Sequence, residues 1–206
     1  MTSVILRRST IIGTPVALGT LAAIHPMMPE DNLGIWNLIH TLQIPLVALL
    51  GISVLLLLRD VRGRIATAAR LAVVPWVAFF AAFDGVAGLA TGALAGFAHE
   101  HPETSATVTD ATSALGDSLF LAAGLPLGAT LFSLIVFGGA AVALQRIGAP
   151  AFAAVAVGIG GVVWTFVHPL IGAPAMLVFL TGALFVELSA RDPRHVAMPA
   201  ARQAQA

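Results

Sequence analysis

Nearly all charged residues of this 206-residue chain fall between long apolar segments, and this distribution limits the possible folds more than any other feature. Hydrophobic residues make up 58% of the chain and charged residues only 10%, whereas soluble domains carry about 25% charged residues. A water-soluble fold of this length would lack the polar residues to cover its surface, but an apolar exterior is favourable in lipid. The sequence therefore predicts an all-α fold, a polytopic transmembrane helix bundle.

The apolar segments number six. A bilayer core requires about 20 apolar residues per helix, and segments of roughly this kind occupy residues 10–24, 35–58, 71–97, 114–144, 151–168 and 171–188. The first is the weakest, because it is short and follows Arg7 and Arg8 as a signal peptide would. Its end is a poor cleavage site, so we expect an uncleaved helix. We predict one six-helix transmembrane domain over residues 1–190 and a short, disordered cytoplasmic tail over residues 191–206.

The arginines predict the orientation of the helices. All ten basic residues other than histidine are arginines, and every one falls on the same side if the six segments alternate in direction: Arg7, Arg8, Arg59, Arg62, Arg64, Arg70, Arg146, Arg191, Arg194 and Arg202. Positively charged loops stay in the cytoplasm, so both termini are expected to be cytoplasmic. The loops on the other side of the membrane carry acidic residues, including Glu30, Glu100 and Asp110, and no arginine.

Composition limits the chemistry, the cellular location and the partners that we expect for this chain. Cysteine is absent, which excludes disulfides, thiolate metal sites and cysteine nucleophiles. Abundant Ala, Gly and Val, without Lys or Tyr, is typical of a high-GC bacterial genome, so we expect the bacterial cytoplasmic (inner) membrane, with the lipid bilayer as partner. A formal net charge of zero and the lack of a basic, aromatic-rich cluster argue against nucleic-acid binding. The chain could form a homo-oligomer or belong to a larger membrane complex.

Asp84 is the leading candidate for a functional residue. It follows Leu71 by about 13 residues, which places it roughly 20 Å into its helix at 1.5 Å per residue. An ionisable side chain at such a depth is costly and requires a partner or a proton. The alternative is that Asp84 holds the bundle together by a hydrogen bond to a neighbouring helix.

A polar stripe on the second segment supplies further candidates. Asn37, His40 and Gln43 are three residues apart, so they share one face of a helix and are expected to face the bundle interior. Asp117 and His168 are expected at the entrance to the same binding or proton-relay site. Asp117 also suits the first turn of a helix, where the dipole favours a carboxylate.

The histidines are the candidates for a metal site. Five of the six are expected near the outer face, where no arginine lies, and neutral imidazoles with carboxylates are ligands that divalent metals accept. The candidate metal ligands are His25, His99, His101 and His168. The alternative is that these histidines only titrate in a polar loop.

Glycines at four-residue spacing predict close helix packing in the third segment. Gly88, Gly92 and Gly96 lie on one helical face, where small residues let two helix backbones approach in lipid.

These features support several functions. The leading hypothesis is a small permease or ion- or proton-coupled carrier with an outward-facing His/Asp site. A second is a redox protein that binds haem b, through His40 and His168, or a quinone. A third is a membrane enzyme acting on a lipid or isoprenoid, with Asp84, Asp117 and His40 as general acid and base. The chain could also be a structural subunit.

Overall fold

The structure is a computed structural model that describes residues 2–165 and 169–189. The predicted tail over residues 191–206 and the side chain of His168 lie outside these residues. Every element within them is helical, which confirms the all-α prediction for this part of the chain. The elements are α1 (Thr2–Ala23), α2 (Leu33–Leu57), α3 (Arg64–Phe83), η1 (Asp84–Ala90), α4 (Thr91–Glu100), η2 (Pro102–Thr104), α5 (Ser105–Gly116), η3 (Phe120–Gly124), α6 (Leu125–Ser133), η4 (Leu134–Gly138), α7 (Gly139–Arg146), α8 (Ala151–Thr165) and α9 (Pro169–Ser189).

Four helical stretches are long and apolar enough to cross a membrane: Leu33–Leu57, Arg64–Glu100, Phe120–Arg146 and Ile171–Ser189. Helix α8 is apolar but shorter, with 15 residues, and α1 does not reach the same hydropathy. The chain is thus a helical protein of the kind that spans membranes, and the count of six spans stays a prediction.

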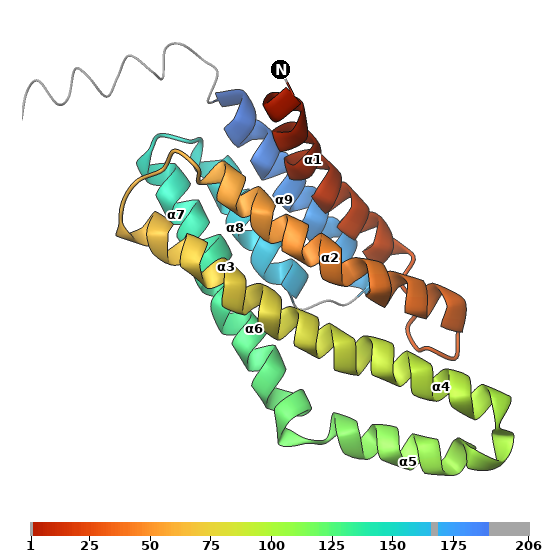
Figure 1. Ribbon diagram of the computed structural model, residues 1–206. Helices are drawn as coiled ribbons and strands as arrows, with labels where there is room; N and C mark the ends of the chain where they lie inside the picture. The colour runs from red at the N-terminus through yellow and green to blue at the C-terminus, as the bar shows by residue number, and fades with distance from the viewer. Residues whose placement is uncertain (1, 166–168, 190–206) are drawn as a thin grey trace, which may run out of the picture.

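Two of these stretches are composite. The second runs from α3 through the π-helix η1 into α4 without a break, and the third joins η3, α6, η4 and α7. The 37 residues of Arg64–Glu100 extend about 55 Å, whereas the hydrocarbon core of a bilayer is about 30 Å thick. The α4 end of this helix therefore extends beyond the main bundle, as Figure 1 shows.

The contacts between the helices form a closed ring. Helix α1 packs between α2 and α9, α2 packs on α3, and α3 packs on α6 and α7. Helix α8 closes the ring, because it contacts both α7 and α9. Consecutive long helices are therefore neighbours in space, as short connections in a bundle require.

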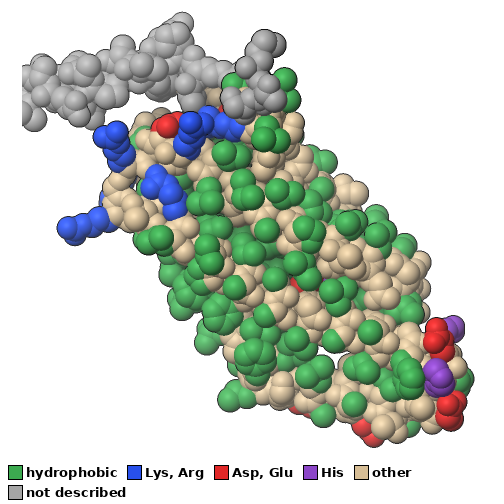
Figure 2. Space-filling view, viewed as in Figure 1, with side chains coloured by type: hydrophobic (Ala, Val, Ile, Leu, Met, Phe, Trp, Pro, Cys, Tyr) green, Lys and Arg blue, Asp and Glu red, His purple; other side chains and the backbone are tan. Residues whose placement is uncertain are grey.

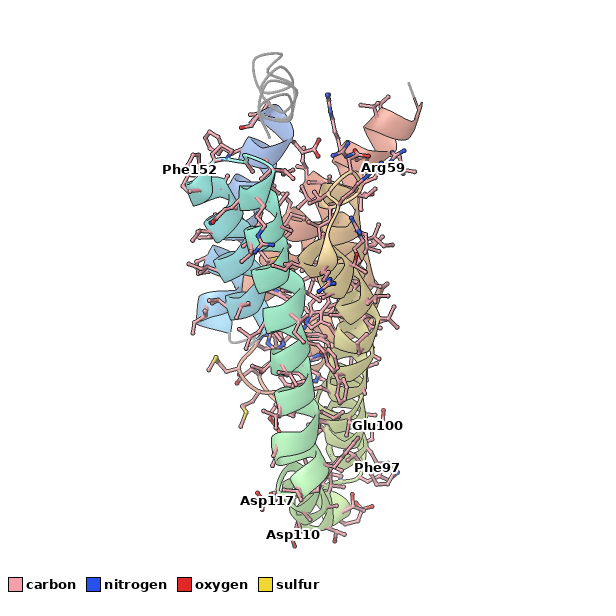
Figure 3. All side chains as sticks on the ribbon, turned by 90° about the vertical axis from the view of Figure 1, so that its left-hand side faces the viewer. Arg59, Phe97, Glu100, Asp110, Asp117 and Phe152 are labelled. Carbon is pink, nitrogen blue, oxygen red and sulfur yellow. The ribbon has the colours of Figure 1, made fainter. Side chains whose placement is uncertain are left out.

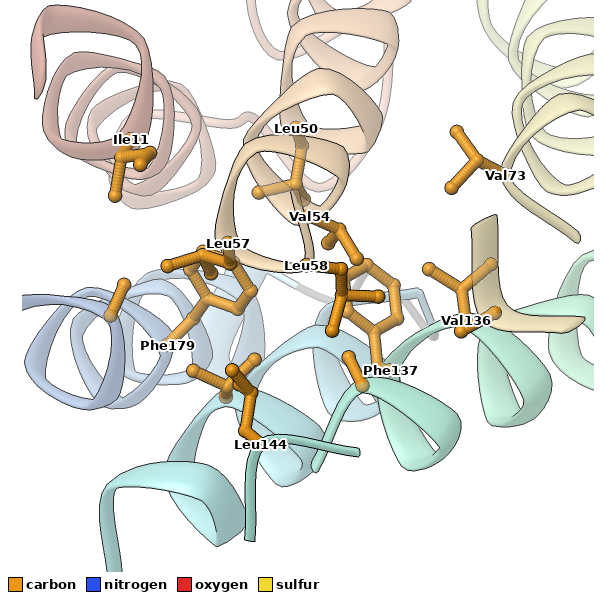
Figure 4. Packing of buried hydrophobic residues seen from close by; sticks show 14 of the residues in the cluster. Ile11, Leu50, Val54, Leu57, Leu58, Val73, Val136, Phe137, Leu144 and Phe179 are labelled. Atoms are coloured by element: carbon orange, nitrogen blue, oxygen red, sulfur yellow. The ribbon is translucent and has the colours of Figure 1, made fainter. Parts of the chain in front are cut away.

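The centre of the ring is filled by large side chains. Trp76 meets Phe137 edge-on at 5.0 Å between ring centroids, and Phe80 stacks on Trp164 at 5.1 Å. Towards the end of the bundle that carries Arg59, aliphatic residues of α2 continue this core against Phe137 and Phe179 (Figure 4). Large apolar side chains are also abundant on the outside of the bundle, as lipid contact permits (Figure 2).

Helix α1 belongs to this bundle. Its Ile11 and Leu18 are fully buried, and Arg7 forms an ion pair with Glu187 of α9 at 2.5 Å. This ion pair joins two helices that lie side by side.

Most charges of opposite sign lie at opposite ends of the bundle, with Asp60 and Glu187 as acids among the arginines. Arginines gather at the end of the bundle where α1 and α3 begin and α2 and α7 end (Figure 2). This end, termed the arginine end, carries Arg7, Arg59, Arg62, Arg64 and Arg146. Figure 3 places Arg59 at this end and Glu100, Asp110 and Asp117 at the other, termed the acidic end. Arg70 donates to the carbonyl of Leu58 at 2.7 Å and to that of Val61, so it caps the last turn of α2.

The polar stretch between the predicted segments 71–97 and 114–144 is largely helical. It forms η2 and α5, which turns back along α4 at the acidic end (Figure 1). Helix α5 stops at Gly116 and Asp117, and the next helix starts at Phe120. The segment predicted to begin at residue 114 thus starts later, because Ala114 and Leu115 belong to α5.

Candidate functional site

A pocket of about 230 Å³ lies where α2 crosses the junction of α3 and η1, under the connection between α1 and α2. Its ionisable groups come from three elements, namely His25 of the connection, His40 of α2 and Asp84 of η1. The remaining lining residues are Pro26, Met27, Trp36, Gln43, Phe80, Phe83, Ala87 and Gly88. The pocket is therefore mainly apolar, with a few polar groups.

His40 and Asp84 form a buried pair at the centre of this site. The distance from His40 Nδ1 to Asp84 Oδ1 is 2.7 Å, and the two residues are only 7% and 3% exposed. They are 44 positions apart in the sequence. An aspartate bound to one ring nitrogen fixes the orientation of the imidazole and leaves the other nitrogen for a ligand or a proton.

The second atom of each group has no partner. His40 Nε2 and Asp84 Oδ2 are both enclosed and make no hydrogen bond within the part of the chain that the structure describes. An enclosed polar atom without a partner costs free energy unless a water molecule or a ligand binds it. This pair of atoms is the strongest chemical feature of the pocket.

The His40 ring packs directly against the backbone of η1 at Gly88. A Cβ atom placed on Gly88 would lie 2.2 Å from His40 Nδ1, so only glycine leaves room for the ring. Gly88 and Asp84 are one helical turn apart, which puts the bare backbone and the carboxylate side by side. The π-helix begins at Asp84, and such single-turn irregularities are frequent at functional sites.

The glycine stripe predicted from the sequence packs against α2. Gly92 faces Asn37 and Trp36, where an added Cβ would come within 2.2 Å of the Asn37 side-chain oxygen, and Gly96 faces Leu33. The stripe therefore allows the first turns of α2 to lie directly on η1 and α4, as the spacing predicted.

Aromatic groups form one wall of the pocket. The Trp36 indole N–H donates to the carbonyl of Gly88 at 2.8 Å, and its ring lies 4.6 Å from that of His40. The His25 ring is edge-on to both, at 5.2 Å from Trp36 and 5.1 Å from His40. The sequence indicated His25 only as a candidate metal ligand, because its contact with Trp36 depends on how the α1–α2 connection folds.

Burial changes the protonation of His25. Its partial desolvation lowers the pKa of the imidazole below the usual value, although a hydrogen bond with the Pro26 carbonyl opposes this. His40 adds a lowering contribution and Asp84 a raising one. His25 therefore favours the neutral form while the connection covers the pocket.

The other predicted site residues take different positions. Gln43 is buried and lines the pocket, whereas Asn37 is half-buried, faces Gly92 and lies outside the pocket lining. Asp117 is exposed at the C-terminus of α5, so it is neither in the first turn of a membrane helix nor at the pocket entrance. His168 lies outside the described residues.

The predicted metal ligands are not brought together. His99 and His101 lie at the end of α4, where the His101 ring stacks on Phe97 at 4.4 Å, and His25 lies in the pocket. His99 instead borders a polar cavity of about 550 Å³ between α4 and α5. Among the residues that the structure describes, no three His, Asp or Glu side chains converge as a metal site.

Asp84 lies further along its helix than the sequence predicted. Helix α3 starts at Arg64, so 20 residues, or about 30 Å, precede Asp84. The pocket is thus separated from the arginine end by most of the length of the bundle.

Comparison with protein families, with curated proteins and with solved structures gives no match for this chain. Its function must therefore be inferred from the site itself.

Proposed function

We propose that this chain is a small proton-coupled carrier of the bacterial cytoplasmic membrane. In this proposal, six helices cross the membrane, both termini are cytoplasmic and the pocket opens towards the outer side. His40 and Asp84 bind the solute and the coupled proton. The arginine end is then the cytoplasmic end, as the positive-inside rule requires.

The observation that carries the proposal is the buried His40–Asp84 pair with its two unpartnered atoms. Ionisable residues within membrane helices are costly, and they commonly mark ion pathways and proton relays. A role confined to holding α2 on η1 would need only the one hydrogen bond. The free Nε2 and Oδ2 atoms favour binding of a further proton or ligand.

The surrounding helices provide places where the bundle could bend. The layer formed by Phe80, Trp76 and Trp164 closes the core next to the pocket, so transport requires this layer to move. Helices α2 and α3 contain Pro45 and Pro75, and α3 continues into the π-helix. Prolines and π-helical turns are the usual causes of helix bending.

The size of the pocket argues against haem. At about 230 Å³ it is smaller than the roughly 300–1,000 Å³ of pockets for drug-sized ligands. A haem b group is larger still, and so is a quinone with its prenyl chain. The site suits a small solute.

A membrane enzyme is the second candidate. The Asp84 carboxylate orients the His40 imidazole by its Nδ1, which is the arrangement of a general base. The predicted lipid or isoprenoid substrate would have to enter the pocket with only its reactive end.

Proteoliposomes with an imposed pH gradient test the proposal. The purified protein is reconstituted, and uptake is measured for a panel of small cationic, neutral and anionic solutes. We expect one solute class to accumulate only with the gradient, and Asp84→Asn to reduce its accumulation at least tenfold. Asp117→Asn is the matched control, because this exposed acid lies away from the pocket. Conversion of a solute into a product, without accumulation, would contradict the carrier and support the enzyme.

A further inference from the structure

We infer that the pocket selects a small organic cation with N–H donors, an amine in its ammonium form, and that this cation competes with a proton for the His40–Asp84 pair. The inference deepens the proposed function, since it names the substrate class of the same site.

The unpaired hydrogen-bonding atoms of the pocket favour a ligand that donates hydrogen bonds. When His40 is neutral and donates through Nδ1 to Asp84, its Nε2 is an acceptor, and Asp84 Oδ2 is an acceptor as well. The two ring nitrogens point away from each other, so Nε2 faces away from Asp84. An ammonium group has several N–H donors and can donate to either acceptor, whereas a carboxylate or an ether has no hydrogen to donate.

The charge of the pocket points to a cation. Asp84 supplies a negative charge, and none of the described lining residues is an arginine or lysine. On α3 itself, the arginine nearest to Asp84 along the helix is Arg70, 14 residues or about 21 Å before it, and its guanidinium donates to the carbonyls of Leu58 and Val61. An anionic solute would meet the Asp84 carboxylate without any compensating charge, which is strongly unfavourable away from water.

The aromatic wall suits the same ligand. Trp36, Phe80 and Phe83 contribute rings to the pocket, and a cation over the face of an aromatic ring is attracted by its quadrupole. A desolvated ammonium ion therefore has both hydrogen-bond acceptors and π-systems within one small volume. The pocket volume limits the substituent on nitrogen to a short chain.

The proton and the amine use the same lone pairs. A protonated His40 donates through both nitrogens, so its Nε2 no longer accepts a hydrogen bond from the amine. The same holds for a protonated Asp84 Oδ2. Binding of one ammonium ion therefore expels one proton, with no covalent change in the ligand. The ionisable groups facing the pocket are His25 from the connection, His40 from α2 and Asp84 from η1.

Binding of radiolabelled methylammonium to the purified full-length protein tests the inference. We expect saturable binding whose affinity rises by up to about tenfold per pH unit while the pair loses its proton, and then becomes constant. In a weakly buffered solution, up to one proton should be released per amine bound in the pH range where the affinity rises, and none where it is constant. Tetramethylammonium, which has no N–H donor, should bind at least tenfold more weakly, because hydrogen bonds to charged groups are among the strong ones.

Matched variants test whether binding depends on the His40–Asp84 pair or on acidic residues elsewhere in the chain. Asp84→Asn should lose both binding and proton release, and Asp117→Asn should retain both. The comparison of methylammonium with tetramethylammonium needs no variant, so it remains decisive if Asp84→Asn does not fold. Acetate or ethanol binding as tightly as methylammonium would overturn the inference, and so would a complete lack of methylammonium binding.

The two proposals fail in different ways. Accumulation of a neutral or anionic solute that depends on Asp84 would preserve the carrier and refute the cation site. Methylammonium binding with proton release, but without transport in proteoliposomes, would preserve the cation site and refute the carrier.

Discussion

Gly88 sets the position of the His40 ring beside Asp84. Any side chain at this position would overlap the ring, since even a Cβ atom would lie 2.2 Å from Nδ1. The contact between α2 and η1 is backbone against imidazole, and it brings the histidine within 2.7 Å of the carboxylate. A residue without a side chain thereby determines the geometry of the two ionisable ones.

Gly88→Ala is expected to disrupt the pair. Overpacking of a dense interior costs about 1–3 kcal/mol, so the variant should unfold at a lower temperature in detergent and lose Asp84-dependent activity. Gly85→Ala is the control, because no atom lies within 4 Å of an added Cβ there. An unchanged melting temperature for Gly88→Ala would show that α2 lies further from η1 than described.

At this scale the sequence identified individual residues but not their contacts. Asp84 and His40 stood out as polar groups in apolar segments, and the glycine spacing predicted a close helix contact. Neither signal specifies that the two side chains meet, because that depends on the register between α2 and η1. The role of His25 in the pocket could not be predicted, since a connection of nine residues between α1 and α2 admits many conformations.

At the scale of elements, α8 and α9 form the contact in which the described glycines come closest to the backbone of another helix. An added Cβ on Gly160 would lie 2.5 Å from the backbone nitrogen of Phe179, and one on Gly182 would lie 2.5 Å from the carbonyl of Ala153. Backbone atoms cannot move aside as a side chain can. The short helix α8 is therefore held in the ring by close backbone packing, as is common in membranes.

Gly160→Ala should separate α8 from α9. We expect a loss of stability of about 1–3 kcal/mol, measured by denaturant or thermal unfolding in mixed micelles. Gly138→Ala has no atom within 4 Å of the new Cβ and should be neutral or slightly stabilising, because alanine favours the helix by about 0.5–1 kcal/mol. Equal effects of the two substitutions would argue against the close α8–α9 contact.

Helix positions were more predictable than helix breaks. The segment expected at 35–58 is α2 at Leu33–Leu57, and the segment at 171–188 falls within α9 at Pro169–Ser189. Apolar length determines these helices, since backbone groups in lipid must bond within their own segment. The helical character of α5 was missed because its Ser and Thr residues resemble a loop, and the π-helices have no sequence signature of this kind.

At the scale of the whole molecule, the separation of charge gives an orientation that can be measured. The chain has no native cysteine, so single cysteines can be introduced without background. In intact bacterial cells, a membrane-impermeant maleimide should label Asp110→Cys at the acidic end. It should label Asp60→Cys, between α2 and α3, only after the membrane is permeabilised. Labelling in the opposite pattern would reverse the proposed orientation of the carrier.

The length of helix that precedes Asp84 also determines how the membrane potential acts on the site. About 30 Å of α3 separates Asp84 from the arginine end, which is close to the full thickness of the hydrocarbon core. In the proposed orientation, a cation that reaches the pocket from outside has crossed little of the electric field, so its affinity should depend only weakly on voltage. The remaining passage carries most of the electrical work, about 2.3 kcal/mol per charge per 100 mV. Exchange of one ammonium ion for one proton moves no net charge over a full cycle, so the accumulation that such a carrier reaches at equilibrium would be the same in a polarised and a depolarised cell.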